Sequence, residues 1–553
     1  MKFIKSTLII SATAALLVGC GVAPIVSTPI KNIDTLPLKI TPLEETQLKK
    51  WSLMDLAQDT VPGMGVERAY KEIIKNKKGH KVIVAVVDSG IDIEHEDLKN
   101  IIWTNPKEIA GNGKDDDKNG YIDDIHGWNF LGNIVAENME YTRIIRKLSP
   151  KYDGKKESSI STSDREEFAL YQKAKAEYDK ELKQTSETVS RYSGMISQLK
   201  PAHKAMTSKL GKEDYSETDL SAIAGPTADE QQQIGMLKQM LNYAGTIPEF
   251  IVLLEGAIQS SSDRVNTHFN LKGDFRSKHL GDNPDDNSNP YYGNNDVDGP
   301  DDKKADARHG THVAGIIAAQ RNNGIGLDGV ADNVEIMVLR AVPDGDEYDK
   351  DIANALRYAV DNGAKVINTS FGKYYSTHPE WVVDAIKYAA KKDVLIVNAA
   401  GNEGLNLDEN IVYPNDQQKN GAEISDTFLT VGALNYKYGG DLVANFSNYG
   451  KTNVDVFGPG VKIWSTTPLN TYEYLQGTSM ASPNVAGVAA VIRSHYPKLS
   501  AKQVKQILMD SGLSTKTQVV LGGDPSNTDG FTNISTSGKM VNMYNALIMA
   551  SKM

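Results

Sequence analysis

The stretch that decides the fold is KVIVAVVD, residues 81–88, an apolar run that ends on a carboxylate. Runs of the same kind recur at 334–341, 364–370, 393–401 and 427–433. Each run is short and almost continuously apolar, which is typical of strands that are buried on both faces. Helical patterns stand between the runs, at 349–363 and 379–393 among others. This alternation predicts an α/β fold with a mostly parallel sheet and helices on both faces, in three layers.

The composition is that of a soluble globular protein, with 40% hydrophobic and 24% charged residues in a chain of 553. The net charge of -11 provides no basic excess that could meet phosphates. We therefore expect no nucleic-acid partner.

The N-terminus has the pattern of an export signal. Two lysines precede an apolar stretch, 7–18, which is short for a membrane span, and the stretch runs into LLVGC, ending at the only cysteine, Cys20. This resembles the lipobox of bacterial lipoproteins, in which the cysteine is lipidated and becomes the mature N-terminus. An ordinary signal peptide with a chance cysteine is the alternative. We expect a signal peptide over 1–19 and a lipidated tether over 20–50. The protein would be an exported bacterial lipoprotein, anchored in a membrane and facing the periplasm or the cell exterior.

Residues 135–280 interrupt the alternation of strands and helices. Between Phe168 and Leu199 the apolar side chains fall at steps of three and four residues, which places them on one face of a helix. A second helical stretch starts near Thr227. We interpret 135–280 as an antiparallel helical hairpin inserted into a domain that spans 51–550. A disordered, charged insertion is the alternative.

Three polar residues stand where chemistry is expected, because ligands of open α/β sheets bind at the carboxyl ends of the strands. Asp88 ends the first strand, His309 opens a small-residue helical run, and Ser479 opens another. Each has a plainer reading: Asp88 as a turn residue, His309 as a helix cap or as a metal pair with His312, Ser479 as an N-cap. However, a serine at a helix N-terminus also lies where N–H groups and the helix dipole stabilise an oxyanion.

Taken together, the three segments closely resemble the signature motifs of the subtilisin-like serine proteases. The motifs read VAVVDSGID at 84–92, HGTHVAG at 309–315 and GTSMASPNVAG at 477–487. Their order, Asp then His then Ser, is the order of the subtilisin triad. One departure is Asn484, where the family more usually has His. The resemblance covers roughly 51–130 and 291–550 and leaves the helical insertion out.

This resemblance implies a serine endopeptidase that hydrolyses peptide bonds through an acyl-enzyme intermediate. Ser479 would be the nucleophile, His309 the general base and then acid, and Asp88 the residue that orients the imidazole. The segment NAAGNEG, 398–404, matches the family's oxyanion segment and assigns that role to Asn402.

The resemblance also implies how substrates bind. INTSFG, 367–372, matches the strand that lines the primary specificity pocket. The expected peptide-binding residues are Ser370, Phe371 and Gly372. They would pair with an extended substrate as with a neighbouring strand. The chemistry would require no cofactor, and the partners would be protein or peptide substrates and a membrane, reached through Cys20.

Two other functions stay open. A non-catalytic scaffold built on a retired protease core is one, but such a core should have lost at least one of the four catalytic side chains, and all four are present. An esterase on another fold is the second. It would require a G-x-S-x-G elbow, whereas Ser479 stands in G-T-S-M-A.

An acidic loop, DDDKNGYIDD at 115–124, is a candidate for a structural calcium site. The oxygen-bearing residues at its first, third, fifth and ninth positions are Asp115, Asp117, Asn119 and Asp123. Gly120 at the sixth position completes a likeness to an EF-hand loop. The twelfth position is His126 and not the usual Glu, so a solvated turn without a cation is the alternative.

Overall fold

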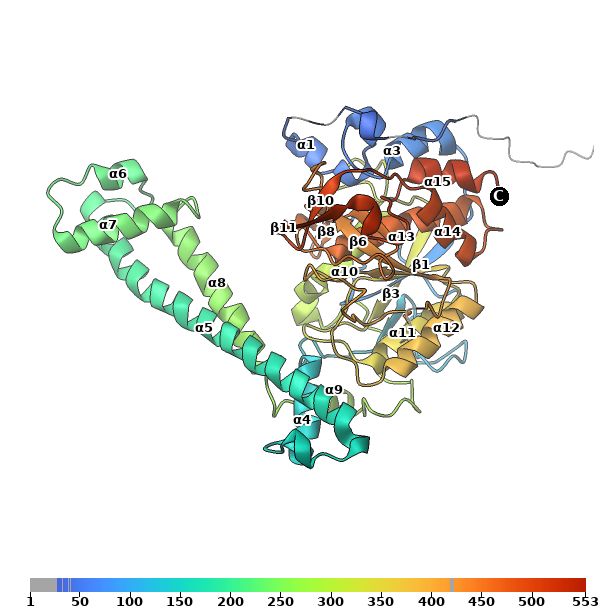
Figure 1. The fold of residues 1–553 in the computed structure, drawn as a ribbon, viewed down its shortest axis with the longest axis horizontal. Coiled ribbons are helices and arrows are strands. Elements are labelled where there is room, and N and C mark those ends of the chain that lie inside the picture. Colours follow the sequence, from blue (N-terminus) through green and yellow to red (C-terminus); the bar gives the residue numbers. More distant parts are fainter. Residues whose placement is uncertain (1–26, 32, 38, 40, 418–421) are drawn as a thin grey trace, which may run out of the picture.

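Seven parallel strands form the sheet at the centre of the body (Figure 1). The computed structural model describes residues 27–553 apart from 32, 38, 40 and 418–421. In spatial order the strands are β2 (Gly127–Asn129), β3 (Val334–Arg340), β1 (Val82–Asp88), β4 (Val366–Thr369), β5 (Leu395–Ala399), β6 (Phe428–Leu434) and β7 (Val456–Pro459). The five expected strands are confirmed, and β2 and β7 are additions.

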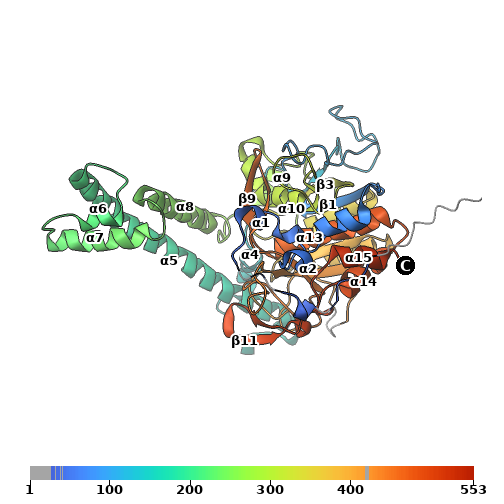
Figure 2. The ribbon, with the colours of Figure 1, turned by 90° about the horizontal axis from the view of Figure 1, so that it is seen from above.

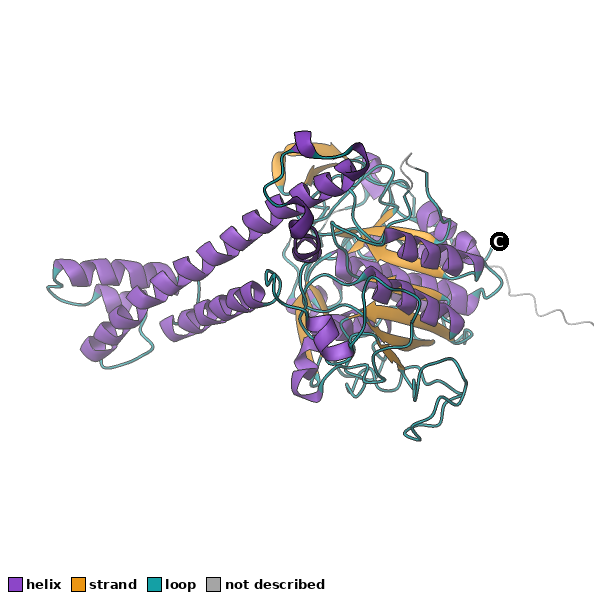
Figure 3. Ribbon diagram, turned by 90° about the horizontal axis from the view of Figure 1, so that it is seen from below, coloured by secondary structure: helices purple, strands orange, loops and turns teal. Residues whose placement is uncertain are grey.

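The sheet has helices on both faces, as Figure 3 shows from below. The strand β1 explains why, since its side chains alternate between two cores. Val84 and Val86 join the cluster that contains helices α10, α13, α14 and α15, whereas Ala85 and Val87 join the cluster that contains α11 and α12. A strand that is buried on both sides has a continuous apolar sequence. The expected three-layer α/β fold is confirmed.

Of the helices that cover the sheet, three lie between its strands in the chain, and the other three follow its last strand. They are α10 (Arg308–Ala318), α11 (Asp349–Asp361), α12 (Pro379–Lys391), α13 (Thr478–His495), α14 (Ala501–Ser511) and α15 (Met543–Ala550). Two antiparallel hairpins lie outside the sheet, β8 (Ile463–Thr467) with β9 (Thr471–Leu475) and β10 (Gln518–Leu521) with β11 (Asp524–Gly530).

The insertion forms a long helical arm that projects from the body (Figures 1 and 2). Its elements are α4 (Glu140–Tyr152), α5 (Arg165–Leu210), α6 (Glu217–Ser221), α7 (Ala228–Leu241), α8 (Ile247–Asn266) and α9 (Phe275–Leu280). A hairpin is present, but the helix that returns along α5 is α8. The stretch after Thr227 forms α7, which packs at the far end with Leu199 of α5.

Two apolar clusters hold the arm together. The far cluster joins buried side chains of α5, α7 and α8, including Leu199, Leu237 and Leu254. The near cluster, which we call the arm root, joins Tyr141, Tyr171, Phe269 and neighbours to Tyr375 of the body. The arm is therefore packed on the body at its root and has its own core at its far end.

The segment expected to be a tether lies against the body where the structure describes it. Ile33 is buried, and Ile30 exchanges two hydrogen bonds with the side chain of Asn545, at 2.8 and 3.1 Å. The Asp34 carboxylate accepts a hydrogen bond from the Thr515 hydroxyl at 2.6 Å. Short helices follow at α1 (Glu45–Leu48), α2 (Leu56–Asp59) and α3 (Val66–Ala69). The sequence did not reveal this packing, because the apolar residues of the segment follow no helical period.

The lipidation candidate Cys20 and the signal segment lie outside the described residues. Within the described part of the chain, no helix combines the length and apolar character required to cross a bilayer.

Candidate active site

Asp88 lies at the carboxyl end of β1 and is 1% exposed. Its Oδ1 accepts a hydrogen bond from the backbone N–H of Ser89 at 2.8 Å and lies 2.7 Å from Nδ1 of His309. A buried carboxylate is costly unless it is hydrogen-bonded or paired. These two donors meet that requirement at Oδ1, whereas the buried Oδ2 has no hydrogen-bond partner in the described chain. Because a carboxylate only accepts, Nδ1 carries the proton, and Nε2 of a neutral His309 keeps its lone pair.

His309 is the second residue of α10, which approaches β1 closely. A Cβ on Gly310 would lie 2.2 Å from the carbonyl oxygen of Gly90, so only glycine permits this approach. Burial by itself would lower the pKa of His309, but the neighbouring Asp88 carboxylate outweighs it and raises the pKa above the usual 6.5. The imidazole therefore has a stabilised protonated form and an available Nε2.

Ser479 is the second residue of α13, directly at the helix N-terminus. Its hydroxyl donates to the carbonyl oxygen of Ser370 at 2.9 Å, and the Ser370 hydroxyl donates to the carbonyl oxygen of Ser479 at the same distance. Asp88, His309 and Ser370 line one cleft of about 430 Å³. The structure thus brings Asp88 to His309 and Ser479 to Ser370, and the Ser479 hydroxyl is directed to Ser370 rather than to His309.

Asn402 lies beside the same helix end. Its Oδ1 accepts hydrogen bonds from the backbone N–H and the hydroxyl of Thr478, at 2.8 and 3.1 Å. The Nδ2 donor contacts no other described residue through a hydrogen bond. A Cβ on Gly477 would lie 3.5 Å from the Ser479 nitrogen and 3.6 Å from Asn402 Nδ2. The same point lies 3.6 Å from Asn402 Oδ1. The two donors are therefore near one another, and together they could stabilise an oxyanion at Ser479.

Sequence reasoning missed Thr478, which fixes the orientation of Asn402. Besides donating to Asn402, its hydroxyl accepts from the backbone N–H of Gly401 at 3.0 Å, and the side chain is fully buried. The signal was present in the motif GTSMASPNVAG, where a hydroxyl precedes the serine. The atypical Asn484 is also fully buried, and its amide donates to the carbonyl oxygens of Pro459 and Met480, both at 3.1 Å.

The three expected peptide-binding residues follow β4 at the edge of the cleft. The backbone groups of Phe371 and Gly372 form no hydrogen bond with any described residue. On one side Ser370 is bound to Ser479, and on the other Lys373 exchanges two backbone hydrogen bonds with Tyr413, both 2.9 Å long. We call residues 370–372 the peptide edge. The backbone groups of its Phe371 and Gly372 are unpaired within the described chain, whereas the Ser370 carbonyl accepts from the Ser479 hydroxyl.

His312 is not part of a metal pair. It is fully buried, and its Nε2 lies 3.1 Å from the carbonyl oxygen of Ile463 and 3.2 Å from that of Glu473. Burial lowers its pKa to about 3, so the ring is neutral and donates to these two carbonyl groups. Its role is to hold the β8–β9 hairpin against α10.

The acidic loop brings together a different set of oxygens from the one expected. Ligand atoms of Glu108, Asp115 and Asp117 all lie within 4.8 Å of one another. Asn119 and Asp123 are engaged elsewhere: Asn119 donates to Asp124 at 2.8 Å, and Asp123 accepts from the backbone N–H of Gly113 at 2.8 Å. Glu108 precedes the loop, so the sequence window for an EF-hand pattern did not include it.

Comparison with known proteins agrees with this geometry. A family model described as the subtilase family matches residues 79–531. The chain belongs to the subtilase family. A thermophilic serine proteinase from Bacillus sp. (strain AK1) is 45% identical over 188 residues, which are 34% of this chain and 42% of that protein. Subtilisin DY from Bacillus licheniformis is 39% identical over 202 residues, 36% of this chain and 68% of that protein.

A longer match covers most of the chain. The cell wall-associated protease of Bacillus subtilis (strain 168) is 31% identical over 419 residues, which cover 71% of this chain and 43% of that protein. This subtilase thus spans less than half the length of two of these relatives. Subtilases are serine endopeptidases, and their chemistry needs no cofactor.

Proposed function

We propose that this subtilase is a serine endopeptidase that cleaves protein or peptide substrates with Ser479, His309 and Asp88. The observation that carries the proposal is the 2.7 Å contact between Asp88 Oδ1 and His309 Nδ1, in a cleft that Ser370 also lines. Ser370 is in turn bonded to Ser479, so the base and the nucleophile share one site.

The first half of the reaction forms an acyl-enzyme. The Ser479 hydroxyl turns from the Ser370 carbonyl toward His309, and its proton passes to Nε2 as Oγ attacks the substrate carbonyl carbon. Asp88 stabilises the imidazolium that results. The oxyanion receives hydrogen bonds from the Ser479 N–H and from Asn402 Nδ2. His309 then gives the proton to the leaving amine as the C–N bond breaks.

The second half releases the product with water. A water molecule gives a proton to His309 Nε2 while its oxygen attacks the acyl carbon. The ester bond to Ser479 breaks, and the proton returns from His309 to Oγ. Throughout, the peptide edge holds the substrate as an added strand, through backbone groups that have no partner within the described chain.

The test is proteolysis with a library of unstructured peptides and purified protein expressed without residues 1–20. We expect cleavage by the unaltered protein and none by Ser479→Ala, which retains the fold. The sequences of the cleaved bonds then define the substrate preference. No cleavage by a well-folded protein, across the whole library, would refute the proposal.

We propose further that the protein is an exported bacterial lipoprotein, anchored through Cys20 and facing the periplasm or the cell exterior. The basis is the lone cysteine after an apolar stretch of signal-peptide length. Mass spectrometry of the N-terminal peptide is expected to find a lipidated Cys20, and Cys20→Ala is expected to move the protein to the aqueous phase of a detergent partition. Unmodified Cys20 in the native host would contradict the anchor.

A structural Ca²⁺ is the one metal we propose, held by Glu108, Asp115 and Asp117. The donor set is chemically suitable, because Ca²⁺ prefers carboxylate oxygens. Glu108 offers an Oε2 that is buried and has no hydrogen-bond partner in the described chain. The ion would stabilise the loop and take no part in the reaction.

A further inference from the structure

The peptide edge is fixed at its two ends and is free between them. At the first end, Ser370 exchanges two hydrogen bonds with Ser479. At the second end, the backbone of Lys373 exchanges two hydrogen bonds with Tyr413. Gly372 has no side chain and is exposed, so it adds no constraint of its own. The position of the edge therefore depends on what holds Lys373.

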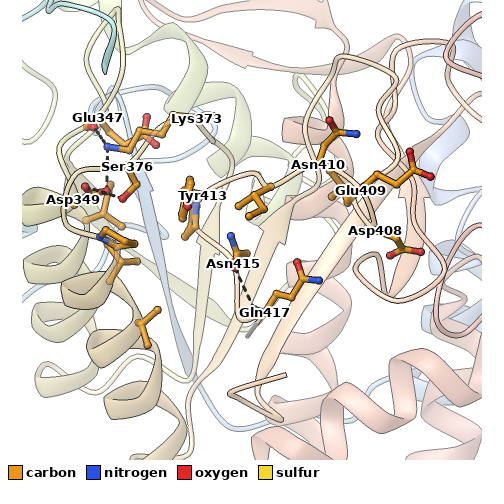
Figure 4. Close-up of a pocket in the computed structure, with 17 residues that line it drawn as sticks. Glu347, Asp349, Lys373, Ser376, Asp408, Glu409, Asn410, Tyr413, Asn415 and Gln417 are labelled. Atoms are coloured by element: carbon orange, nitrogen blue, oxygen red, sulfur yellow. Dashed lines mark hydrogen bonds and ion pairs between the residues drawn. The ribbon is translucent and has the colours of Figure 1, made fainter. Parts of the chain in front are cut away.

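The Lys373 side chain is 2% exposed, and its ammonium group contacts three oxygens. Its Nζ donates to the carbonyl oxygen of Glu347 at 2.8 Å and lies 3.0 Å from Asp349 Oδ1 and 3.2 Å from Glu140 Oε2. Figure 4 shows this ammonium between Glu347 and Asp349, with Tyr413 beside it, on the wall of a pocket of about 410 Å³. An ammonium held by three oxygens in a buried site has little freedom to move.

One of these three oxygens belongs to the arm. Glu140 is the first residue of α4, in the insertion, and is also buried. Arg143 forms an ion pair with it, and the Thr377 hydroxyl donates to its Oε1 at 3.1 Å. Burial alone would raise the pKa of Glu140, but Arg143 and Lys373 lower it to about 2. Glu140 is thus a fixed anion that the arm supplies to the body.

The same stretch of chain touches the arm a second time. Tyr375 is buried in the arm root, where its ring centroid lies 6.1 Å from that of Tyr141, and its hydroxyl donates to the carbonyl oxygen of Lys173 at 3.3 Å. Between these contacts, the Tyr374 hydroxyl accepts from Asn448 at 3.4 Å. Asn448 itself accepts from the N–H groups of Glu403 and Leu405, which follow Asn402.

We propose that Lys373 is a positioning residue for the peptide edge, and that the arm, through Glu140, is a working part of the peptide-binding site. This rests on the proposed endopeptidase function and extends it. The arm would determine how well an extended substrate binds, while leaving the reaction at Ser479 unaffected. Short reagents that do not reach the peptide edge would react with Ser479 at a rate that does not depend on the arm.

The test compares two substrates in Glu140→Gln, which keeps the shape of the side chain and removes its charge. For an extended fluorogenic peptide we expect KM to rise about tenfold, the loss of roughly one hydrogen bond, with kcat unchanged. The rate of labelling by a fluorophosphonate, which reacts with the serine without occupying the edge, is expected to stay at the wild-type value. Glu140→Asp, which restores the charge, should recover part of the KM effect.

The matched control is Glu255→Gln, which breaks an ion pair between Lys200 and Glu255 elsewhere in the arm, 2.6 Å long and exposed. It should leave KM and labelling unchanged. A folded Glu140→Gln with the wild-type KM would overturn the proposal, as would an equal loss of labelling and peptide hydrolysis. If Glu140→Gln does not fold, we expect the double variant Glu140→Gln/Lys373→Met to show the same rise in KM and the same unchanged labelling rate. If the folded wild-type protein neither reacts with the fluorophosphonate nor cleaves the peptide, the endopeptidase function itself would be refuted.

Discussion

Asp88 Oδ1 and His309 Nδ1 lie 2.7 Å apart, and this contact raises the pKa of His309 above 6.5. The contact joins the end of a sheet strand to the start of a helix that follows 221 positions later. Catalysis needs the neutral imidazole, because only its free Nε2 can accept the serine proton.

The first prediction concerns pH. We expect kcat/KM to rise with pH through a midpoint above 6.5, as His309 loses its proton. In Asp88→Asn the midpoint should fall, and kcat should drop about 10⁴-fold, as in other serine proteases with this arrangement. Since the folded pKa is the raised one, the pair also stabilises the fold at low pH. That stability is complete below about 6.5 and is lost as pH rises through the folded pKa. An unchanged midpoint in Asp88→Asn would show that the carboxylate does not tune His309.

The second prediction concerns the oxyanion. Asn402→Ala is expected to lower kcat by about 10²–10³ with little change in KM, a magnitude that comes from subtilisin itself and not from this structure. Thr478→Val keeps the backbone donor to Asn402 and removes only the hydroxyl, so it should have a smaller effect. Steady-state kinetics on one peptide measures both. A loss that appears in KM alone would assign Asn402 to substrate binding.

The third prediction concerns calcium. Ca²⁺ in large excess is expected to raise the Tm of the unaltered protein, corresponding to about 2.7 kcal/mol at a hundredfold excess over Kd. Glu108→Gln and Asp117→Asn should abolish the increase. Asp116→Asn is the matched control, because Asp116 lies in the same loop but is not one of the three clustered carboxylates. It accepts hydrogen bonds from Ile109 and Asn112 instead. An equal Ca²⁺ effect in Glu108→Gln would exclude this site.

The fourth prediction concerns the arm. Leu254 is 5% exposed in the far cluster, whereas the neighbouring Leu253 is 60% exposed. Leu254→Ala should destabilise the far end of the arm by about 2–5 kcal/mol, and Leu253→Ala should not. Hydrogen exchange in 195–254 should therefore accelerate only in Leu254→Ala, while fluorophosphonate labelling stays constant in both. Equal protection in the two variants would mean that the far cluster does not hold the arm.

The sheet could be predicted from the sequence because its central strands are buried on both sides. An unbroken apolar run such as 82–87 has few other interpretations when helices flank it. The strands β2 and β7 were missed because they are short and carry no such run. In the arm, α8 was missed because the five consecutive apolar residues 250–254 hide its helical period, although only some of them face α5.

The site was predictable in part, for a related reason. Asp88, His309 and Ser479 each close or open a regular element, so a motif marks their position. Glu108 acts through folded geometry, and no local pattern distinguishes it from an ordinary loop glutamate. Thr478 stands inside the serine motif, but only the fold shows that its hydroxyl contacts Asn402. The Lys373–Glu140 pair joins residues that are 233 positions apart. Only the fold brings them together.

We propose that His309 activates Ser479 as a nucleophile. Labelling with a fluorophosphonate, followed by mass spectrometry of the peptides, tests it most directly. We expect one modified residue, Ser479, with labelling abolished in Ser479→Ala and strongly slowed in His309→Ala. Modification at another serine, or labelling of Ser479 at an undiminished rate in His309→Ala, would contradict it.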